Sequence, residues 1–190
     1  MVRELLYGPR RFSDLRESLP SISPNVLSQR LKDLEHIGVI HRHQLPPPAG
    51  SWVYELTPWG GQLEPILQQL GRWGVQSPTM PLHAPISVAT GLSAMNTMFS
   101  PAAAQGLELS IVLHLGAEIF TVGVRGAQLS IMRGEVGQPD ARITGDINRL
   151  RDVIFGGMTL AEAEAEGWLS VAGNGAVAQR FTALFPLGAG

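Results

Sequence analysis

The sequence contains no cysteine, which excludes disulfide bonds and metal sites built from thiolates. It also lacks a run of about 18 apolar residues, the length that a membrane-spanning helix needs. The N-terminal residues have no long apolar stretch before a small-residue cleavage site, so they do not resemble a secretory signal. Together these absences predict a protein of the reducing cytoplasm that has no membrane span.

A strong excess of either charge is absent as well, because 14 Lys and Arg residues face 16 Asp and Glu residues in 190. The distribution is uneven: residues 1–76 hold eight basic and seven acidic side chains, and residues 77–190 hold six and nine. An acidic chain with a local basic face can still bind nucleic acid, in a salt-sensitive manner. The apolar fraction of 44% is sufficient for well-packed cores.

Three prolines within residues 77–85 predict a linker there. We therefore expect one domain over residues 1–76 and a second over residues 86–190. We find no internal repeat and no low-complexity tract.

The first domain shows local signals for two short helices followed by a hairpin. Ser23 precedes Pro24, an arrangement typical of a helix start, and Gly38 follows the last apolar residue of that helix. The patterns predict helices over 13–19 and 24–37, strands over 39–43 and 52–56, and a helix over 58–76. This order is typical of a winged helix-turn-helix, which places one helix in the DNA major groove.

Candidate DNA-binding residues follow from the faces of these elements. With Leu27, Leu31 and Leu34 facing the core, the helix starting at Pro24 turns Asn25, Ser28, Gln29 and Lys32 away from it and carries Arg30 at the flank. Asn and Gln can pair with adenine, whereas Arg and Lys can pair with guanine. Basic residues before the first helix and on the first wing strand could contact phosphates. The full set is Arg10, Arg11, Ser23, Asn25, Ser28, Gln29, Arg30, Lys32, His41, Arg42 and His43. The alternatives are an ordinary solvated helix face and a winged helix that binds protein.

The second domain is predicted to be α+β, with a mainly antiparallel sheet covered by helices. We expect helices over 86–99, 146–155, 159–166 and 173–185, and strands over 107–115, 118–125, 128–133, 141–144 and 168–171. Its apolar side chains could line a ligand cavity or form an ordinary filled core, and the sequence does not decide between them. The candidate ligand-binding residues are Leu109, Ile111, Leu113, Phe120, Val122, Val124, Phe155, Met158, Phe181 and Phe185.

Other motifs predict neither a metal site nor a catalytic site. His41 and His43 share a strand face and could hold a metal, but the sequence offers no Cys or neighbouring carboxylate, so a basic wing is favoured. The glycines of residues 173–178 fit a loose dinucleotide fingerprint, but no acidic residue follows about 20 positions later, so they indicate a helix start. We find no nucleophile context and no catalytic constellation, and we expect no cofactor and no enzymatic activity.

Residues 8–43, GPRRFSDLRESLPSISPNVLSQRLKDLEHIGVIHRH, and residues 54–73, YELTPWGGQLEPILQQLGRW, closely resemble the HxlR family of winged-helix transcriptional regulators. The resemblance covers about residues 2–76. It implies a homodimer that reads palindromic double-stranded DNA, with the helix at Pro24 as the reader and residues 39–56 as the wing. Members of that family usually carry a further N-terminal helix before the position of Val2.

The second domain resembles the sterol-carrier-protein type of lipid-binding domain. The resemblance is carried by the alternating strands at 107–133, by PDARITGD at 139–146 and by VAGNG at 171–175. It implies an apolar tunnel for acyl chains, acyl-CoA or sterols. The combined reading is a DNA-binding transcriptional regulator with an apolar-ligand sensor. The alternatives are a lipid carrier or sequestering protein whose winged helix serves only dimerisation, and an accessory domain that presents acyl substrates to an enzyme.

Overall fold

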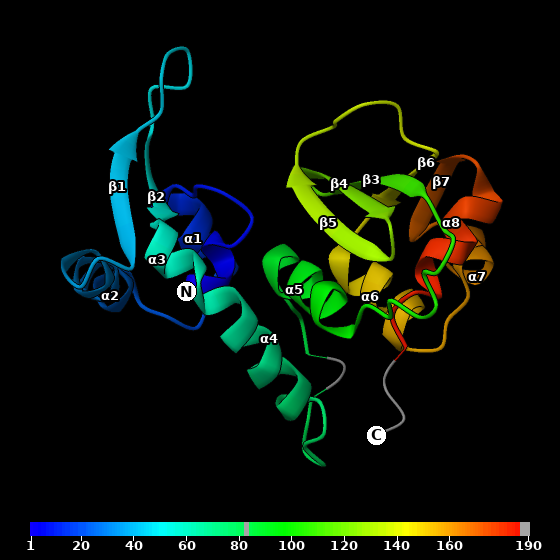
Figure 1. Ribbon diagram of the computed structural model, residues 1–190. Helices are drawn as coiled ribbons and strands as arrows, with labels where there is room; N and C mark the ends of the chain where they lie inside the picture. The colour runs from blue at the N-terminus through cyan, green and yellow to red at the C-terminus, as the bar shows by residue number, and fades with distance from the viewer. Residues whose placement is uncertain (82–83, 187–190) are drawn as a thin grey trace. The chain divides into compact units, whose positions relative to one another are not determined.

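The computed structural model describes residues 1–81 and 84–186 (Figure 1). It divides the chain into two compact units, Met1–Met80 and Pro81–Gly190. The division falls within the predicted linker, residues 77–85, of which 82–83 lie outside the described residues, as do 187–190 of the predicted second domain. No described helix combines the length and apolar character needed to cross a bilayer.

The first unit is a helix-turn-helix followed by a two-stranded antiparallel hairpin. In chain order its elements are a 3₁₀ helix η1 (Val2–Leu5), α1 (Phe12–Ser18), α2 (Pro24–His36), β1 (Ile40–Gln44), β2 (Trp52–Leu56), α3 (Pro58–Gly61) and α4 (Leu63–Gly74). The predicted order of helices and strands is confirmed.

The predicted helix over 58–76 is instead two helices, α3 and α4, separated at Gln62. Pro65 has no backbone N–H, so it cannot donate to the carbonyl of Gly61 four residues earlier. Gly60 and Gly61 also have low helix propensity. The chain therefore interrupts the helix where both effects coincide.

Local signals fix both ends of α2. The Ser23 hydroxyl accepts a hydrogen bond from the backbone N–H of Val26 (3.4 Å), and Pro24 occupies the first helical position. At the other end, Gly38 has a φ of 76°, a left-handed conformation that favours glycine. These signals set the length of α2, and the burial of its leucines sets which of its side chains face solvent.

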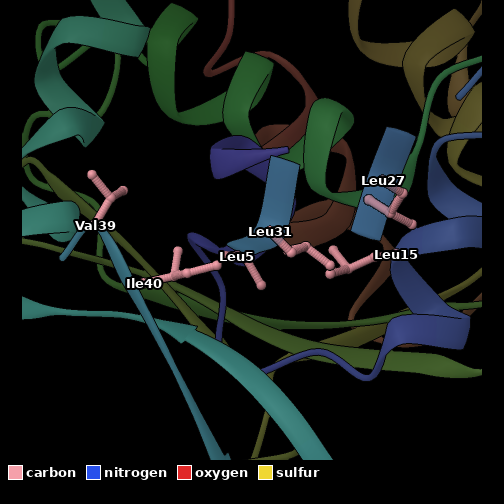
Figure 2. Packing of buried hydrophobic residues seen from close by; sticks show 6 residues of the cluster. All are labelled: Leu5, Leu15, Leu27, Leu31, Val39 and Ile40. Carbon is pink, nitrogen blue, oxygen red and sulfur yellow. The ribbon is translucent and has the colours of Figure 1, made fainter. Parts of the chain in front are cut away.

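The core beneath α2 is a cluster of six buried aliphatic side chains. Figure 2 shows these side chains, which come from η1, α1, α2, the residue before β1 and the first residue of β1: Leu5, Leu15, Leu27, Leu31, Val39 and Ile40. Leu27 and Leu31 are fully buried, and Leu34 is only partly buried against the same cluster. This burial holds α2 against the hairpin and turns its other face to solvent.

The second unit is a five-stranded sheet with helices. Its elements are α5 (Val88–Met98), β3 (Leu109–Leu115), β4 (Glu118–Arg125), β5 (Gln128–Arg133), β6 (Ala141–Gly145), α6 (Ile147–Phe155), α7 (Leu160–Ala165), β7 (Leu169–Gly173) and α8 (Gly175–Thr182). The strand order is β5-β4-β3-β6-β7; β3 and β6 are parallel, and the other three pairs are antiparallel. The predicted mixed α+β class with a mainly antiparallel sheet is therefore confirmed.

The two faces of this sheet differ in character. On one face Ile111, Leu113, Phe120 and Val122 are fully buried, and α5, α6 and α8 lie on that side (Figure 1). On the other face Thr121 holds the loop between β5 and β6: its hydroxyl donates to the carbonyl of Gly134 (2.8 Å) and accepts from the N–H of Val136 (2.9 Å).

Candidate nucleic-acid interface

The exposed face of α2 carries the side chains predicted to read bases. Asn25, Gln29, Arg30 and Lys32 are exposed, whereas Ser28 is half-buried. Asn25, Gln29 and Lys32 lie opposite the fully buried Leu27 and Leu31 of the same helix, whereas Ser28 and Arg30 flank that side, as the helical period requires. The structure thus brings the predicted base-reading residues onto one solvent-facing surface, which we call the α2 face.

Asp33 restrains two residues of the α2 face, and the sequence reading missed it. Its Oδ1 accepts a hydrogen bond from Gln29 Nε2 (2.8 Å), and its Oδ2 lies 4.0 Å from the guanidinium of Arg30. Exposed pairs of this kind contribute about 0–1 kcal/mol. Asp33 can therefore orient both side chains in the free protein and release them at low cost. The i, i+4 spacing of Gln29 and Asp33 is the signal that could have indicated this pair.

The two arginines before α1 differ in exposure. Arg10 is only 6% exposed, and its backbone pairs with Tyr54 through two hydrogen bonds of 3.0 and 2.8 Å. This bridge ties the start of α1 to β2, so the backbone of Arg10 helps to hold the first unit together. The predicted contact of Arg10 with phosphate stays a prediction. Arg11 is exposed, and its backbone N–H donates to Asp14 Oδ2 (3.1 Å) in the first turn of α1. Of the two, Arg11 presents its charge to solvent.

The three predicted DNA contacts of the wing, His41, Arg42 and His43, lie on two different faces of the hairpin. Arg42 pairs across the hairpin with Tyr54, and its guanidinium lies over the rings of Trp52 (4.7 Å) and Tyr54 (5.9 Å). His41 and His43 lie on the other face, because successive strand residues alternate. Arg42 and the two histidines therefore cannot act as one basic patch.

Glu55 on β2 joins the two histidines. It pairs directly with His41 in the strand register, and its Oε2 lies 3.6 Å from Nε2 of His41 and 3.6 Å from Nε2 of His43. The sequence reading found no carboxylate near these histidines. That expectation was wrong, because Glu55 comes from the opposite strand, twelve residues beyond His43 in the chain.

An exposed apolar surface follows the two helices after the hairpin. Trp59 on α3 and Ile66, Leu70 and Trp73 on α4 are each more than half exposed. Val39, Trp59, Gln62, Leu63 and Ile66 line a cavity of about 270 Å³ at its α3 end. Contiguous exposed apolar residues of this kind mark interaction surfaces.

Most of the predicted ligand-binding residues lie in the core of the second unit. Eight are 8% exposed or less, namely Leu109, Ile111, Leu113, Phe120, Val122, Val124, Phe181 and Phe185. Phe155 and Met158 are partly exposed. The rings of Phe181 and Phe185 pack edge to face with centroids 5.2 Å apart. These contacts describe a packed interior in the free protein.

A groove of about 520 Å³ is lined from the other face of the same sheet. Its lining includes Ser110, Thr121, Gly123, Ser130 and Met132. It shares only Leu109 and Val124 with the predicted ligand-binding set. The volume falls within the range of small-molecule sites, about 300–1,000 Å³.

Comparison with known proteins gives matches over the first unit. The HxlR-like helix-turn-helix family matches residues 1–80. The uncharacterized HTH-type transcriptional regulator YvaP of Bacillus subtilis is 41% identical over 76 residues, covering 40% of this chain and 70% of YvaP. The HTH-type transcriptional regulator YodB of the same organism is 34% identical over 76 residues, covering 40% of this chain and 68% of YodB. The solved reduced form of YodB has a TM-score of 0.38 at 33% identity and covers 41% of this chain and 76% of that chain.

A further match is with the sec-alkylsulfatase Pisa1 from Pseudomonas sp.. It covers 49% of this chain and 15% of that chain, with 14% identity and a TM-score of 0.46. Similarity at this level supports no conclusion about activity or ligand.

Proposed function

Since the chain belongs to the HxlR-like helix-turn-helix family, matched over residues 1–80, we propose that it is a DNA-binding transcriptional regulator without enzymatic activity. The observation that carries the proposal is the α2 face: four polar or basic side chains are exposed on a helix whose Leu27 and Leu31 are fully buried. The adjoining hairpin supplies a wing.

In this proposal α2 enters the major groove with its N-terminal half nearest the bases. Asn25 and Gln29 offer amide groups to adenine, whereas Arg30 and Lys32 offer donors to guanine. Gln29 and Arg30 exchange their contacts with Asp33 for contacts with bases. Arg11 and Arg42 remain exposed for phosphates, which set position and salt dependence but carry no sequence information.

The regulator is proposed to act as a homodimer. The exposed side chains of Ile66, Leu70 and Trp73 give α4 an apolar surface that a second copy of this chain could cover. A symmetric dimer places two copies of α2 on half-sites about 34 Å apart, so the operator is expected to be palindromic.

The test is fluorescence anisotropy of the full chain with labelled DNA from its own upstream region and with scrambled DNA, at several salt concentrations. The double substitution Gln29→Ala and Arg30→Ala should abolish the preference for the specific DNA and leave the fold intact. The matched control is Gln179→Ala with Arg180→Ala, a second exposed Gln-Arg pair, on α8.

Specific binding that weakens steeply with salt supports the proposal, since phosphate contacts release counterions. Equal preference in the parent and the Gln29/Arg30 variant would overturn the assignment of α2 as the reader. A folded dimer that binds neither DNA would instead favour the lipid-carrier function.

We further propose that the second unit senses an apolar ligand such as an acyl chain or a sterol. The support is the apolar side of the sheet, and the ligand must displace packed side chains because the predicted lining is buried. Val122→Trp, on the helix-covered face, should block uptake of a fluorescent fatty acid. Ser130→Trp, in the groove on the other face, should not. Loss of uptake in the Ser130 variant alone would move the site to the groove, and unchanged uptake in both would refute a site on either face.

A further inference from the structure

The wing carries three side chains with the chemistry of a transition-metal site. His41 and His43 lie two residues apart on one face of β1, and Glu55 faces them from β2. One nitrogen or oxygen from each residue lies within 4.8 Å of the other two. The pairing of two regular strands holds these donors close together.

The two imidazoles lie side by side and reach the same carboxylate oxygen. Their rings are stacked, with centroids 4.9 Å apart and planes inclined by 20°. Both Nε2 atoms lie 3.6 Å from the same carboxylate oxygen of Glu55. The Nδ1 of His43 is buried and has no hydrogen-bond partner among the described residues, so Nε2 is the nitrogen available to an ion.

The two separations from Glu55 already suit a bound ion, whereas the stacked rings must turn so that both Nε2 atoms point at it. Zinc binds imidazole nitrogen at about 2.0–2.1 Å and carboxylate oxygen at about 2.0–2.2 Å, so two ligands of one tetrahedral ion lie about 3.4 Å apart. The 3.6 Å separations are already close to that value. All three side chains are between one third and one half exposed, so they can rotate without disturbing the core.

We infer that His41, His43 and Glu55 form a binding site for a divalent transition-metal ion. Two imidazoles and one carboxylate suit Zn²⁺, Ni²⁺ or Cu²⁺, whereas Mg²⁺ and Ca²⁺ prefer oxygen ligands. Three protein ligands leave at least one coordination position for water or another ligand. The neighbouring Arg42 lies on the opposite face of the hairpin, so its charge does not point into the site.

The inference is tested by titrating Zn²⁺ into the chelator-treated full chain by calorimetry. We expect one Zn²⁺ per chain and no comparable binding of Mg²⁺. His41→Gln, His43→Gln and Glu55→Gln should each weaken the affinity by at least about tenfold, since changes in the surrounding shell alone cost 10–100-fold. His36→Gln, an exposed histidine at the end of α2, is the matched control and should bind as the parent does.

A second measurement guards against variants that fail to fold. In the parent chain, Zn²⁺ should shift the ring ¹⁵N signals of His41 and His43 and leave those of His36 in place. Undiminished affinity in the double His41/His43 variant, or ring signals that do not respond, would overturn the site. This test involves no DNA, so its result is independent of the proposed regulatory function.

Discussion

Thr57 connects the end of α2, the wing and α3 through one hydroxyl group. Its Oγ1 donates to the carbonyl oxygen of Gly38 (2.7 Å) and accepts from the backbone N–H of Gly60 (3.0 Å). Replacement by valine keeps the shape of the side chain and removes these two hydrogen bonds, together with the longer one to the carbonyl of Val39 (3.3 Å). The loss of an N-cap costs about 1 kcal/mol, and the unmatched carbonyl of Gly38 adds about 1 kcal/mol. We therefore expect Thr57→Val to destabilise the first unit by about 2 kcal/mol.

Urea unfolding of the full chain followed by tryptophan fluorescence measures this change, because Trp52, Trp59 and Trp73 lie in the first unit and only Trp168 lies in the second. With a urea dependence of about 1–2 kcal/mol per M, the midpoint should fall by about 1–2 M. Thr57→Ser keeps the hydroxyl and serves as the control. The reasoning is refuted if the valine variant unfolds with the parent, or if the serine variant loses as much stability as the valine variant.

Three further predictions concern the dimer, the wing and a helix cap. Ile66→Glu should place a charge in the proposed dimer surface and convert the protein to monomers, as sedimentation analysis would show, whereas persistence of a dimer would place the interface elsewhere. Zn²⁺ should tighten DNA binding and make the slope of the logarithm of the binding constant against log salt concentration steeper by about one to two, because it adds two positive charges to the wing. His41→Gln should remove this effect, and a Zn²⁺ response that survives in that variant would contradict the prediction. Hydrogen bonds from Thr159 lower the pKa of Glu162 below its ordinary value of 4.5. The resulting stabilisation of α7 is present above about pH 4.5 and is lost as pH falls through the lowered pKa. NMR titration of the Glu162 carboxyl should give that lowered pKa in the parent and a smaller lowering in Thr159→Val, because valine removes the hydroxyl donor but keeps the backbone N–H.

The parts of the fold that sequence predicted well depend on local interactions. Ser23 and Pro24 set the start of α2 and Gly38 sets its end within the chain segment itself, so a reader of the sequence can place them. The strands of the second unit show period-two alternation and turn glycines, and β4 and β5 have the predicted bounds. The break between α3 and α4 was not predicted, because the apolar residues of 58–76 recur at helical spacing on both sides of it although Pro65 lies between them.

The features that sequence did not predict depend on pairing between distant residues. Arg10 is buried because its backbone bridges to Tyr54, 44 positions later, and nothing beside Arg10 in the sequence indicates this. Glu55 meets His41 only through the register of the hairpin. A reader who aligns the two predicted strands about the loop could find that pair, whereas a search for neighbours along the chain cannot.

Regulation of DNA binding by a ligand in the second unit would impose a reciprocal requirement. If a ligand changes the affinity for DNA by some factor, DNA must change the affinity for the ligand by the same factor. A ligand that binds equally to the DNA-competent and incompetent forms produces no change, however tightly it binds. Measuring fatty-acid affinity with and without operator DNA therefore tests the sensor independently of any transcription assay. Equal affinities would show that the second unit does not regulate DNA binding through that ligand, even if it binds it.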